Sequence, residues 1–292
     1  MEKVLSGWSS AGSHLIAECV DISNTIFGNE ERKAVDPYVV SVVQKLYVSC
    51  HITSESALLL IRNGREWDAD LLCRSVLEGT YKLLYMLEGN EVEIRQKCYE
   101  YWELLPDLAA LKRSARADAF IRAVPNPESP DWIPIKDLML PDDESERIKS
   151  SIDKKSSKQL AQRWSFMEIA KYFLESERQE LKLLGHLGYG FGMSSHQVHK
   201  DGDGVGIIME RLDREADRYK AVKLGHCARV VSDVTTFAKL RLLVVLGLFG
   251  VKADGLVALE KKFEVLTRSL SMAAENFSRI EYGVSHRHVD KA

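Results

Sequence analysis

Apolar residues recur at the three- and four-residue spacing of amphipathic α-helices along nearly the whole chain. The clearest example begins at Asp36, an N-cap residue followed by proline at the first helical position, and ends before Gly64, a C-cap signal. This pattern predicts a helix over residues 36–63. The next segment, residues 65–89, keeps a wide apolar arc, so we expect it to form an antiparallel hairpin with the first helix.

Further helical segments follow the same spacing. They cover residues 91–106, 107–123, 164–175, 177–184, 207–249 and 253–280. The chain shows no strand-like alternation and no internal repeat, and its 292 residues with 45% apolar content suffice for a sizeable core. We therefore expect an all-α protein, a multi-helix bundle built from long antiparallel helical hairpins.

Helix-breaking residues are few, and they gather in two stretches. Five of the 7 prolines lie between residues 125 and 141, and six of the 18 glycines lie between residues 188 and 206. The first stretch, with the charged sequence after it, predicts an irregular connector. We expect one domain, with two domains as the alternative. Its parts are the N-terminal helices 1–123, the Pro-rich and charged connector 124–163 and the C-terminal helices 164–292.

Charge is nearly balanced, with 40 Lys and Arg against 43 Asp and Glu and a formal net charge of −3. The molecule as a whole therefore has no basic field, and binding of nucleic acid requires a local patch. The five cysteines are isolated and form no CxxC pair, which indicates reduced core residues of a cytoplasmic protein. The N-terminus shows no secretory signal pattern. The longest apolar run, residues 242–251, is too short for a membrane span.

The most informative segment runs from Trp67 to Tyr85. At about 100° per residue, Arg74, Glu78 and Tyr81 lie on one aromatic and aliphatic stripe of the predicted helix. A charge pair inside such a stripe costs on the order of several kcal/mol in desolvation per ion. Two interpretations remain open: the Arg74–Glu78 pair is a structural link between helices, or Arg74 binds an anion or phosphate and Glu78 orients it.

The glycine-rich stretch 188–206 holds a second group of candidates. Ser195, His196 and His199 lie where a helix end meets this loop, a place where backbone N–H groups can approach a ligand. Histidine near neutral pH acts as a general acid or base. Alternatively, both histidines are ordinary surface residues. His226 falls on the apolar stripe of a long predicted helix, where we expect a hydrogen-bonded core histidine.

Ligand motifs of known spacing do not occur in the sequence. Asp201 begins a stretch that resembles a calcium loop, but Leu212 stands where such a loop needs a bidentate glutamate. The glycines lack the preceding strand of a dinucleotide site, and no P-loop, HExxH, GxSxG or paired ExxH is found. We therefore expect no cofactor and no metal.

Together the two candidate segments resemble an uncharacterised bacterial helical family, domain of unknown function 5677. The sequence ADLLCRSVLEG at residues 69–79, followed by Tyr81 and Tyr85, resembles the RSxxE helix of that family. The later Tyr189-x4-Ser194-Ser195-x3-His199 resembles its Tyr, Ser and His signature. This chain has additional glycines around that signature, which leaves open whether His196 or His199 is the functional histidine.

The resemblance implies a HEPN-like all-helical bundle, a bacterial defence or toxin system, and a meeting of Arg74, Glu78 and His199 in space. Such a trio could cleave RNA without a metal. Histidine would take the 2′-OH proton, arginine would stabilise the phosphorane, and the carboxylate would orient the arginine. The expected catalytic residues are Arg74, Glu78, His199 and Ser195, and the expected binding residues are Tyr189, His196, Lys200 and Tyr81. Lys154, Lys155 and Lys158 are expected as further phosphate contacts.

Two functional hypotheses follow. The first is a metal-independent ribonuclease or toxin-like effector that acts on RNA phosphodiesters. The alternative is a non-catalytic helical module that binds a partner or a small ligand, with a structural Arg74–Glu78 pair. A metal or cofactor enzyme has the least support, because carboxylates and histidines are not spaced for such a site. We expect a homodimer, since wide apolar arcs of helical bundles often pair in symmetric dimers, and an operon-encoded protein partner is a further expectation.

Overall fold

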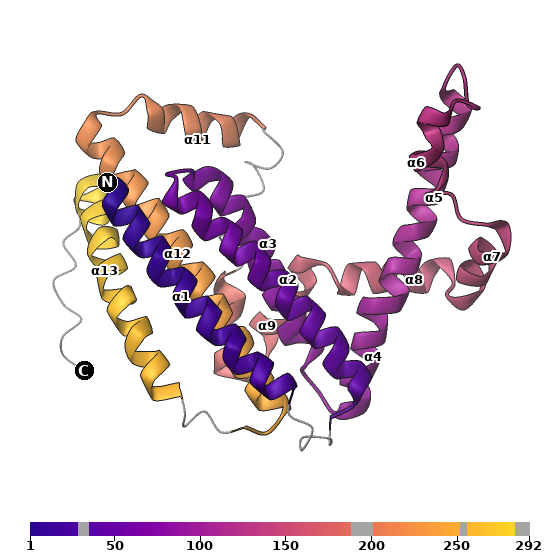
Figure 1. Ribbon diagram of the computed structural model, residues 1–292, viewed down its shortest axis with the longest axis horizontal. Helices are drawn as coiled ribbons and strands as arrows, with labels where there is room; N and C mark the ends of the chain where they lie inside the picture. The colour runs from indigo at the N-terminus through magenta and orange to yellow at the C-terminus, as the bar shows by residue number, and fades with distance from the viewer. Residues whose placement is uncertain (29–34, 188–200, 252–255, 284–292) are drawn as a thin grey trace. The chain divides into compact units, whose positions relative to one another are not determined.

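The computed structural model describes residues 1–28, 35–187, 201–251 and 256–283 (Figure 1). Within these ranges every regular element is a helix and no strand occurs, so the expected all-α multi-helix fold is confirmed. Contacts between residues divide the chain into two units. The first comprises residues 1–87 and 170–292, and the second comprises residues 88–169. The prediction of a single domain stays a prediction.

The first unit is built around one long central helix. Its helices are α1 (Glu2–Phe27), α2 (Pro37–Arg62), α3 (Glu66–Met86), α11 (Gly202–Leu212), α12 (Ala216–Leu248) and α13 (Val257–Tyr282). α9 (Phe166–Glu175) crosses the boundary between the units, and residues 179–187 are also helical. α12 contacts α1, α2, α3 and α13 (Figure 1). Apolar residues occupy several faces of α12, which is why it can be covered by four neighbours.

The predicted hairpin of α2 and α3 is confirmed. The Asp36 side chain accepts a hydrogen bond of 2.8 Å from the Tyr38 backbone N–H, and proline follows at the first helical position. Gly64 has a φ of +66°, the left-handed conformation that ends a helix. The two helices pack so closely that a Cβ atom at Gly79 would overlap Cys50 Sγ.

The predicted helix over residues 207–249 is wrong, because two helices occupy this range. α11 ends at Leu212 and α12 starts again after Glu215, whose backbone is not helical, with φ −53° and ψ 146°. The glycine-rich loop also ends earlier than expected. The Asp201 side chain accepts a hydrogen bond of 2.9 Å from the Gly204 backbone N–H and caps α11, so residues 202–206 are helical despite their glycines.

The second unit contains the connector predicted at residues 124–163. The prediction that it is irregular is wrong for its charged part, because residues 142–151 and 154–163 form α-helices. The elements of this unit are α4 (Glu91–Tyr99), the π-helical turn η2 (Glu100–Leu104), α5 (Leu105–Ala123), the short 3₁₀ turn η3 (Pro130–Trp132), α6 (Ile133–Lys136), α7 (Asp142–Ser151) and α8 (Lys154–Arg163). The expected helix end at Pro106 is wrong. The wider turn η2 precedes this proline, whose missing N–H then lies in the first turn of α5, and the helical path continues. Glu100 anchors the turn by accepting hydrogen bonds from Arg163 and Trp164.

All five cysteines are buried and none forms a disulfide, as the sequence predicts. Burial raises the pKa of the Cys19 and Cys227 thiols to about 12, so these side chains behave as small apolar residues. Over the ranges that the structure describes, no helix combines the length and the apolar character needed to cross a membrane.

Candidate functional site

The predicted site residues on α3 are only partly accessible. Arg74 and Glu78 are half-buried, and the partner that the structure shows for Glu78 is Lys82, with 2.6 Å between Oε1 and Nζ. Tyr81 is fully buried, its O–H donates to the Leu184 carbonyl, and burial raises the pKa of its phenol. Tyr81 is therefore a core residue, while the Arg74–Glu78 pair stays a prediction.

The other predicted residues come from two segments of the chain, residues 189–200 and residues 154–158. Tyr189, Ser195, His196, His199 and Lys200 lie outside the described residues. The meeting of Arg74, Glu78 and His199 therefore stays a prediction. The lysines proposed as phosphate contacts lie in α8 of the second unit, where Lys154, Lys155 and Lys158 are exposed.

The structure instead brings together four charged or titratable side chains between α3 and α12. We call Asp70, His226, Arg229 and Asp233 the α3–α12 cluster. One Asp70 oxygen lies 3.4 Å from His226 Nε2, and the other accepts a hydrogen bond from Arg229 Nη2. Arg229 Nη1 donates to Asp233 at 3.1 Å. One arginine thus joins two carboxylates, and the histidine contacts the first of them.

Helix geometry explains this convergence. His226, Arg229 and Asp233 are spaced three and four residues apart, so they share one face of α12. Asp70 lies on the face of α3 that packs against α12. Two further basic side chains of α12 make polar contacts with α3, and one of them also contacts α2. Lys223 Nζ lies 3.2 Å from the buried carboxylate of Glu66, and the fully buried Arg241 donates to the hydroxyls of Thr80 at 2.8 Å and Ser54 at 3.4 Å.

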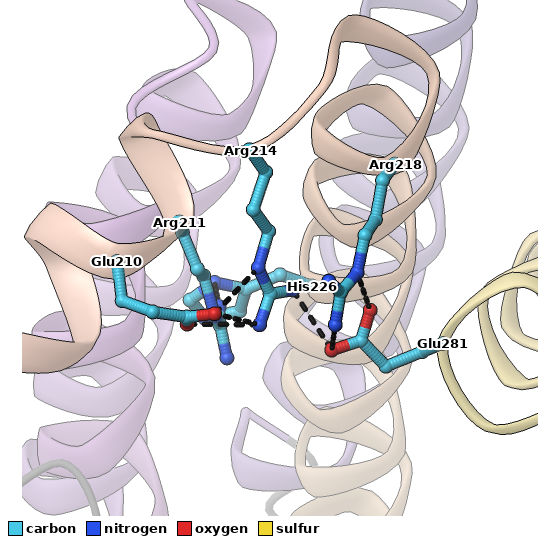
Figure 2. A network of polar contacts seen from close by, with 6 residues as sticks. All are labelled: Glu210, Arg211, Arg214, Arg218, His226 and Glu281. Atoms are coloured by element: carbon cyan, nitrogen blue, oxygen red, sulfur yellow. Dashed lines mark hydrogen bonds and ion pairs between the residues drawn. The ribbon is translucent and has the colours of Figure 1, made fainter.

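The protonation of His226 follows from its contacts. Arg211 Nη1 lies 3.3 Å from His226 Nδ1, and Figure 2 shows this arginine reaching from α11 to the histidine. Because a guanidinium group only donates, Nδ1 accepts this hydrogen bond, and Nε2 carries the hydrogen that faces Asp70. Trp67 packs its ring edge-to-face against the imidazole, with 4.9 Å between centroids. Burial lowers the pKa of His226, so the ring is neutral at pH 7.

The two carboxylates of the cluster differ strongly in acidity. Burial opposes ionisation of Asp70, but the hydrogen bonds from His226 and Arg229 and the charge of Arg229 outweigh it and lower its pKa to about 2. Burial dominates at Asp233, where it raises the pKa to about 6 against the opposing charge of Arg229. Such a separation assigns one permanent anion and one group that can exchange a proton near neutral pH.

The cluster has a covered side and an accessible side. The side chains of Asp70 and His226 are each 7% exposed, whereas that of Asp233 is 30% exposed and that of Arg229 is 44% exposed. A ligand can therefore contact Arg229 and Asp233 directly, while Asp70 and His226 hold Arg229 from behind. Among the described residues, no group of three or more His, Cys, Asp or Glu side chains is placed to hold a metal ion.

Part of this site can be predicted from the sequence. His226 was expected as a hydrogen-bonded core histidine, and its burial and its contacts with Asp70 and Arg211 confirm this. Asp70 was missed although it lies in the segment that resembles the family motif, since its partners on α12 are more than 150 residues away. The available signal was the spacing of His226, Arg229 and Asp233 on one helix face.

Fold and cluster together describe an all-α protein with a polar site between two packed helices. A family model described as Family of unknown function (DUF5677) matches residues 40–217, which is more than half of the chain, and the protein belongs to this family. No curated protein and no solved structure gives a significant match. The matched range includes Asp70 and Arg211, whereas His226, Arg229 and Asp233 follow it. The HEPN-like character stays a prediction.

Proposed function

We propose that the protein cleaves RNA phosphodiesters without a metal ion, and that the α3–α12 cluster is its catalytic site. The observation that supports this most is geometric: Arg229 is hydrogen-bonded to the carboxylates of Asp70 and Asp233 at the partly exposed side of the cluster. The pKa values of these two carboxylates are shifted in opposite directions. Groups whose environments drive their pKa values apart are typical of acid–base sites.

RNA is the substrate that such a site can use. A phosphodiester hydrolysed by water needs a strong external nucleophile, which many enzymes generate with a metal ion. RNA carries its own nucleophile, the 2′-OH group, next to the reacting phosphorus. A base that accepts its proton and a cation that stabilises the phosphorane then suffice. Asp233 and Arg229 offer these two groups on the accessible side of the cluster.

The proposed reaction is a transesterification within the RNA. The Asp233 carboxylate takes the proton from the 2′-OH group, the 2′ oxygen forms a bond to phosphorus, and the bond from phosphorus to the 5′ oxygen breaks. The leaving 5′ oxygen takes a proton from water. The products are a 2′,3′-cyclic phosphate and a 5′-hydroxyl end. Arg229 is held by Asp70, whose own position is fixed by the neutral His226, so the guanidinium group is oriented before the substrate binds.

The test is cleavage of a labelled single-stranded RNA in the presence of a chelator. We expect wild-type protein to release fragments that end in a 2′,3′-cyclic phosphate, and Asp233→Asn to lower the rate by about one hundred- to ten thousand-fold. Asp21→Asn, which removes an exposed carboxylate from α1, is the matched control and should cleave like wild type. Intact RNA in every wild-type reaction, or equal rates for Asp233→Asn and wild type, would overturn the proposal.

A second candidate function is a non-catalytic module that binds an anionic ligand. The engagement of both ring nitrogens of His226 favours it, because this histidine has no free lone pair for a reaction. Under this proposal Arg229→Ala weakens ligand binding or lowers the melting temperature, while no turnover is found. The same RNA assay with Arg74→Ala, Ser195→Ala and His199→Ala tests whether the residues expected from the sequence contribute.

Both functions fit the wider expectations from the sequence, which we also retain as proposals. They are a cytoplasmic protein, a homodimer, a place in a bacterial defence or toxin system, and a protein partner encoded in the same operon. Size-exclusion chromatography with light scattering tests the dimer. A monomer at micromolar concentration would contradict it.

A further inference from the structure

Three arginines converge where α11 turns into α12. Arg211 lies in the last turn of α11, Arg214 in the connection and Arg218 in the first turns of α12 (Figure 2). We call Arg211, Arg214 and Arg218 the elbow arginines. None of them belongs to the α3–α12 cluster, but Arg211 contacts it through its hydrogen bond with His226. The sequence offered no reason to single out this connection.

Two carboxylates form ion pairs with two of the elbow arginines. Glu281, in the last turn of α13, accepts hydrogen bonds of 2.9 and 3.1 Å from Arg218 Nε and Nη2, and it lies 2.9 Å from Arg214 Nη1. Glu210 accepts from the other edge of Arg214 at 2.7 to 2.9 Å. Figure 2 shows Glu281 reaching in from α13 toward both arginines. Its side chain is only 10% exposed and that of Arg214 only 12%.

One of the elbow arginines contacts no carboxylate among the described residues. Arg211 forms no ion pair with a carboxylate in the described ranges; its guanidinium group lies 4.7 Å above the Trp67 ring and donates to the neutral His226. The direct ion pairs therefore join two carboxylates to Arg214 and Arg218 but not to Arg211. The stacked Arg211 keeps N–H groups directed away from the ring, and these groups can bind an anion.

We propose that the elbow arginines form a binding site for an RNA phosphodiester, and that Glu281 holds this site closed. The inference rests on the proposed action on RNA. A phosphate group carries the same paired acceptor oxygens as a carboxylate, and it can replace Glu281 in the bidentate contact with Arg218 and the contact with Arg214. Arg211 supplies the third contact, which Glu281 does not use.

The position of Glu281 makes such an exchange possible. It lies one residue before the end of α13, which closes at Gly283 with a φ of +65°. Glu210 and the elbow arginines belong to α11, α12 and their connection, so only the last turn of α13 must open to free Arg218 and the Nη1 group of Arg214. Terminal turns of helices open at a low free energy compared with helix interiors. Glu281 thus competes with the substrate for two of the three arginines.

A purely structural role for Glu281 predicts a different result. If the carboxylate only fastens the end of α13 to α12, its removal lowers the melting temperature and leaves RNA affinity unchanged. If it closes a phosphate site, its removal raises RNA affinity whatever happens to the melting temperature. Binding and stability therefore separate the two roles.

The experiment measures binding of a fluorescein-labelled single-stranded RNA in the Asp233→Asn background, where the RNA stays intact. We expect Glu281→Gln to bind the RNA about tenfold more tightly at low salt. We also expect a plot of log affinity against log salt to become steeper by about 1.4, which is about 0.7 for each regained phosphate contact. Adding Arg218→Gln should cancel most of this gain. Glu275→Gln, an exposed change of the same charge on α13, is the control and should leave the affinity within about twofold of its parent.

Each outcome has a defined meaning. Equal affinity of Glu281→Gln and Glu275→Gln would overturn the inference. Displacement of the RNA by an equal concentration of inorganic phosphate would overturn the assignment to phosphodiesters. If Glu281→Gln binds RNA more tightly but wild-type protein never cleaves RNA, the catalytic proposal fails and the binding site stands. If wild-type protein cleaves RNA but Glu281→Gln changes neither affinity nor rate, the catalytic proposal stands and this inference fails.

Discussion

Asp233→Asn should make the fold more stable near neutral pH, although the same change should strongly slow the proposed reaction. Burial favours the protonated form of this carboxyl group, so its ionisation in the folded protein costs free energy. Asparagine has nearly the same shape and no charge, and its Oδ1 can still accept the hydrogen bond from Arg229 Nη1. The substitution removes the cost and keeps the contact.

The magnitude follows from the pKa of Asp233, which is about 6 in the folded protein against 3.8 for an ordinary aspartate. Each tenfold change in proton affinity corresponds to about 1.4 kcal/mol, so the full shift corresponds to about 3 kcal/mol. Solvent reaches 30% of the side chain and screens part of this effect. We therefore expect about 2 kcal/mol. The folded state of wild type binds the proton of Asp233 more tightly than the unfolded state does. Wild type therefore keeps its full stability below about pH 4 and loses this amount as the pH rises through about 6.

Urea unfolding, followed by circular dichroism at about pH 4 and about pH 7.5, measures this difference. Relative to wild type, Asp233→Asn should gain about 2 kcal/mol in the free energy of unfolding at the higher pH and almost nothing at the lower pH. Asp21→Asn should match wild type at both. A variant that is no more stable than wild type at the higher pH, or that gains equally at both, would refute the assignment of a raised pKa to Asp233.

Three further changes test the packing around the site. Asp70→Asn should lower the free energy of unfolding at neutral pH by about 2 kcal/mol, because Arg229 and His226 of α12 lose their carboxylate partner. Wild type should lose this advantage as the pH falls from about 4 toward 2, where Asp70 takes up a proton. Arg241→Met should be neutral or stabilising by up to about 2 kcal/mol, because an apolar chain replaces a buried cation that has no carboxylate partner in the described ranges. The hydroxyl of Thr80 still donates to its own helix. A large loss of stability in urea unfolding would contradict this. Gly79→Ala should lower the free energy of unfolding by about 1–3 kcal/mol, and with it the melting temperature, because the new Cβ overlaps Cys50 Sγ. A higher melting temperature, as expected for the same change in an exposed helix, would show that the hairpin can open.

Local signals predicted the helices well where they were present. The N-cap at Asp36 and the left-handed Gly64 are encoded in neighbouring residues, and the hairpin they define is confirmed. The break between α11 and α12 has no proline or glycine at residues 213–215, so the apolar period appeared continuous across it. The structure shows that Arg214 in this break pairs with Glu210 and with Glu281 of another helix. Contacts of that kind cannot be read from a local window.

The candidate site depends even more on contacts between residues that are distant in sequence. The sequence pattern selected Arg74 and Glu78 because they interrupt an apolar stripe, and it did not select Asp70, one turn earlier on the same helix. Helix periodicity identifies a face, but only the packing of α3 on α12 shows which polar residue meets a partner. The raised pKa of Asp233 depends on burial by residues distant in sequence, so no motif could have revealed it.

The pH dependence of RNA cleavage tests the central claim most directly. Under single-turnover conditions with a chelator present, we predict that the cleavage rate rises about tenfold per pH unit at low pH and levels off above about pH 6, where most of Asp233 has lost its proton. Asp233→Asn should lack this rise. A rate that is lost on chelation, or a profile that is the same in wild type and Asp233→Asn, would contradict metal-independent cleavage by this carboxylate.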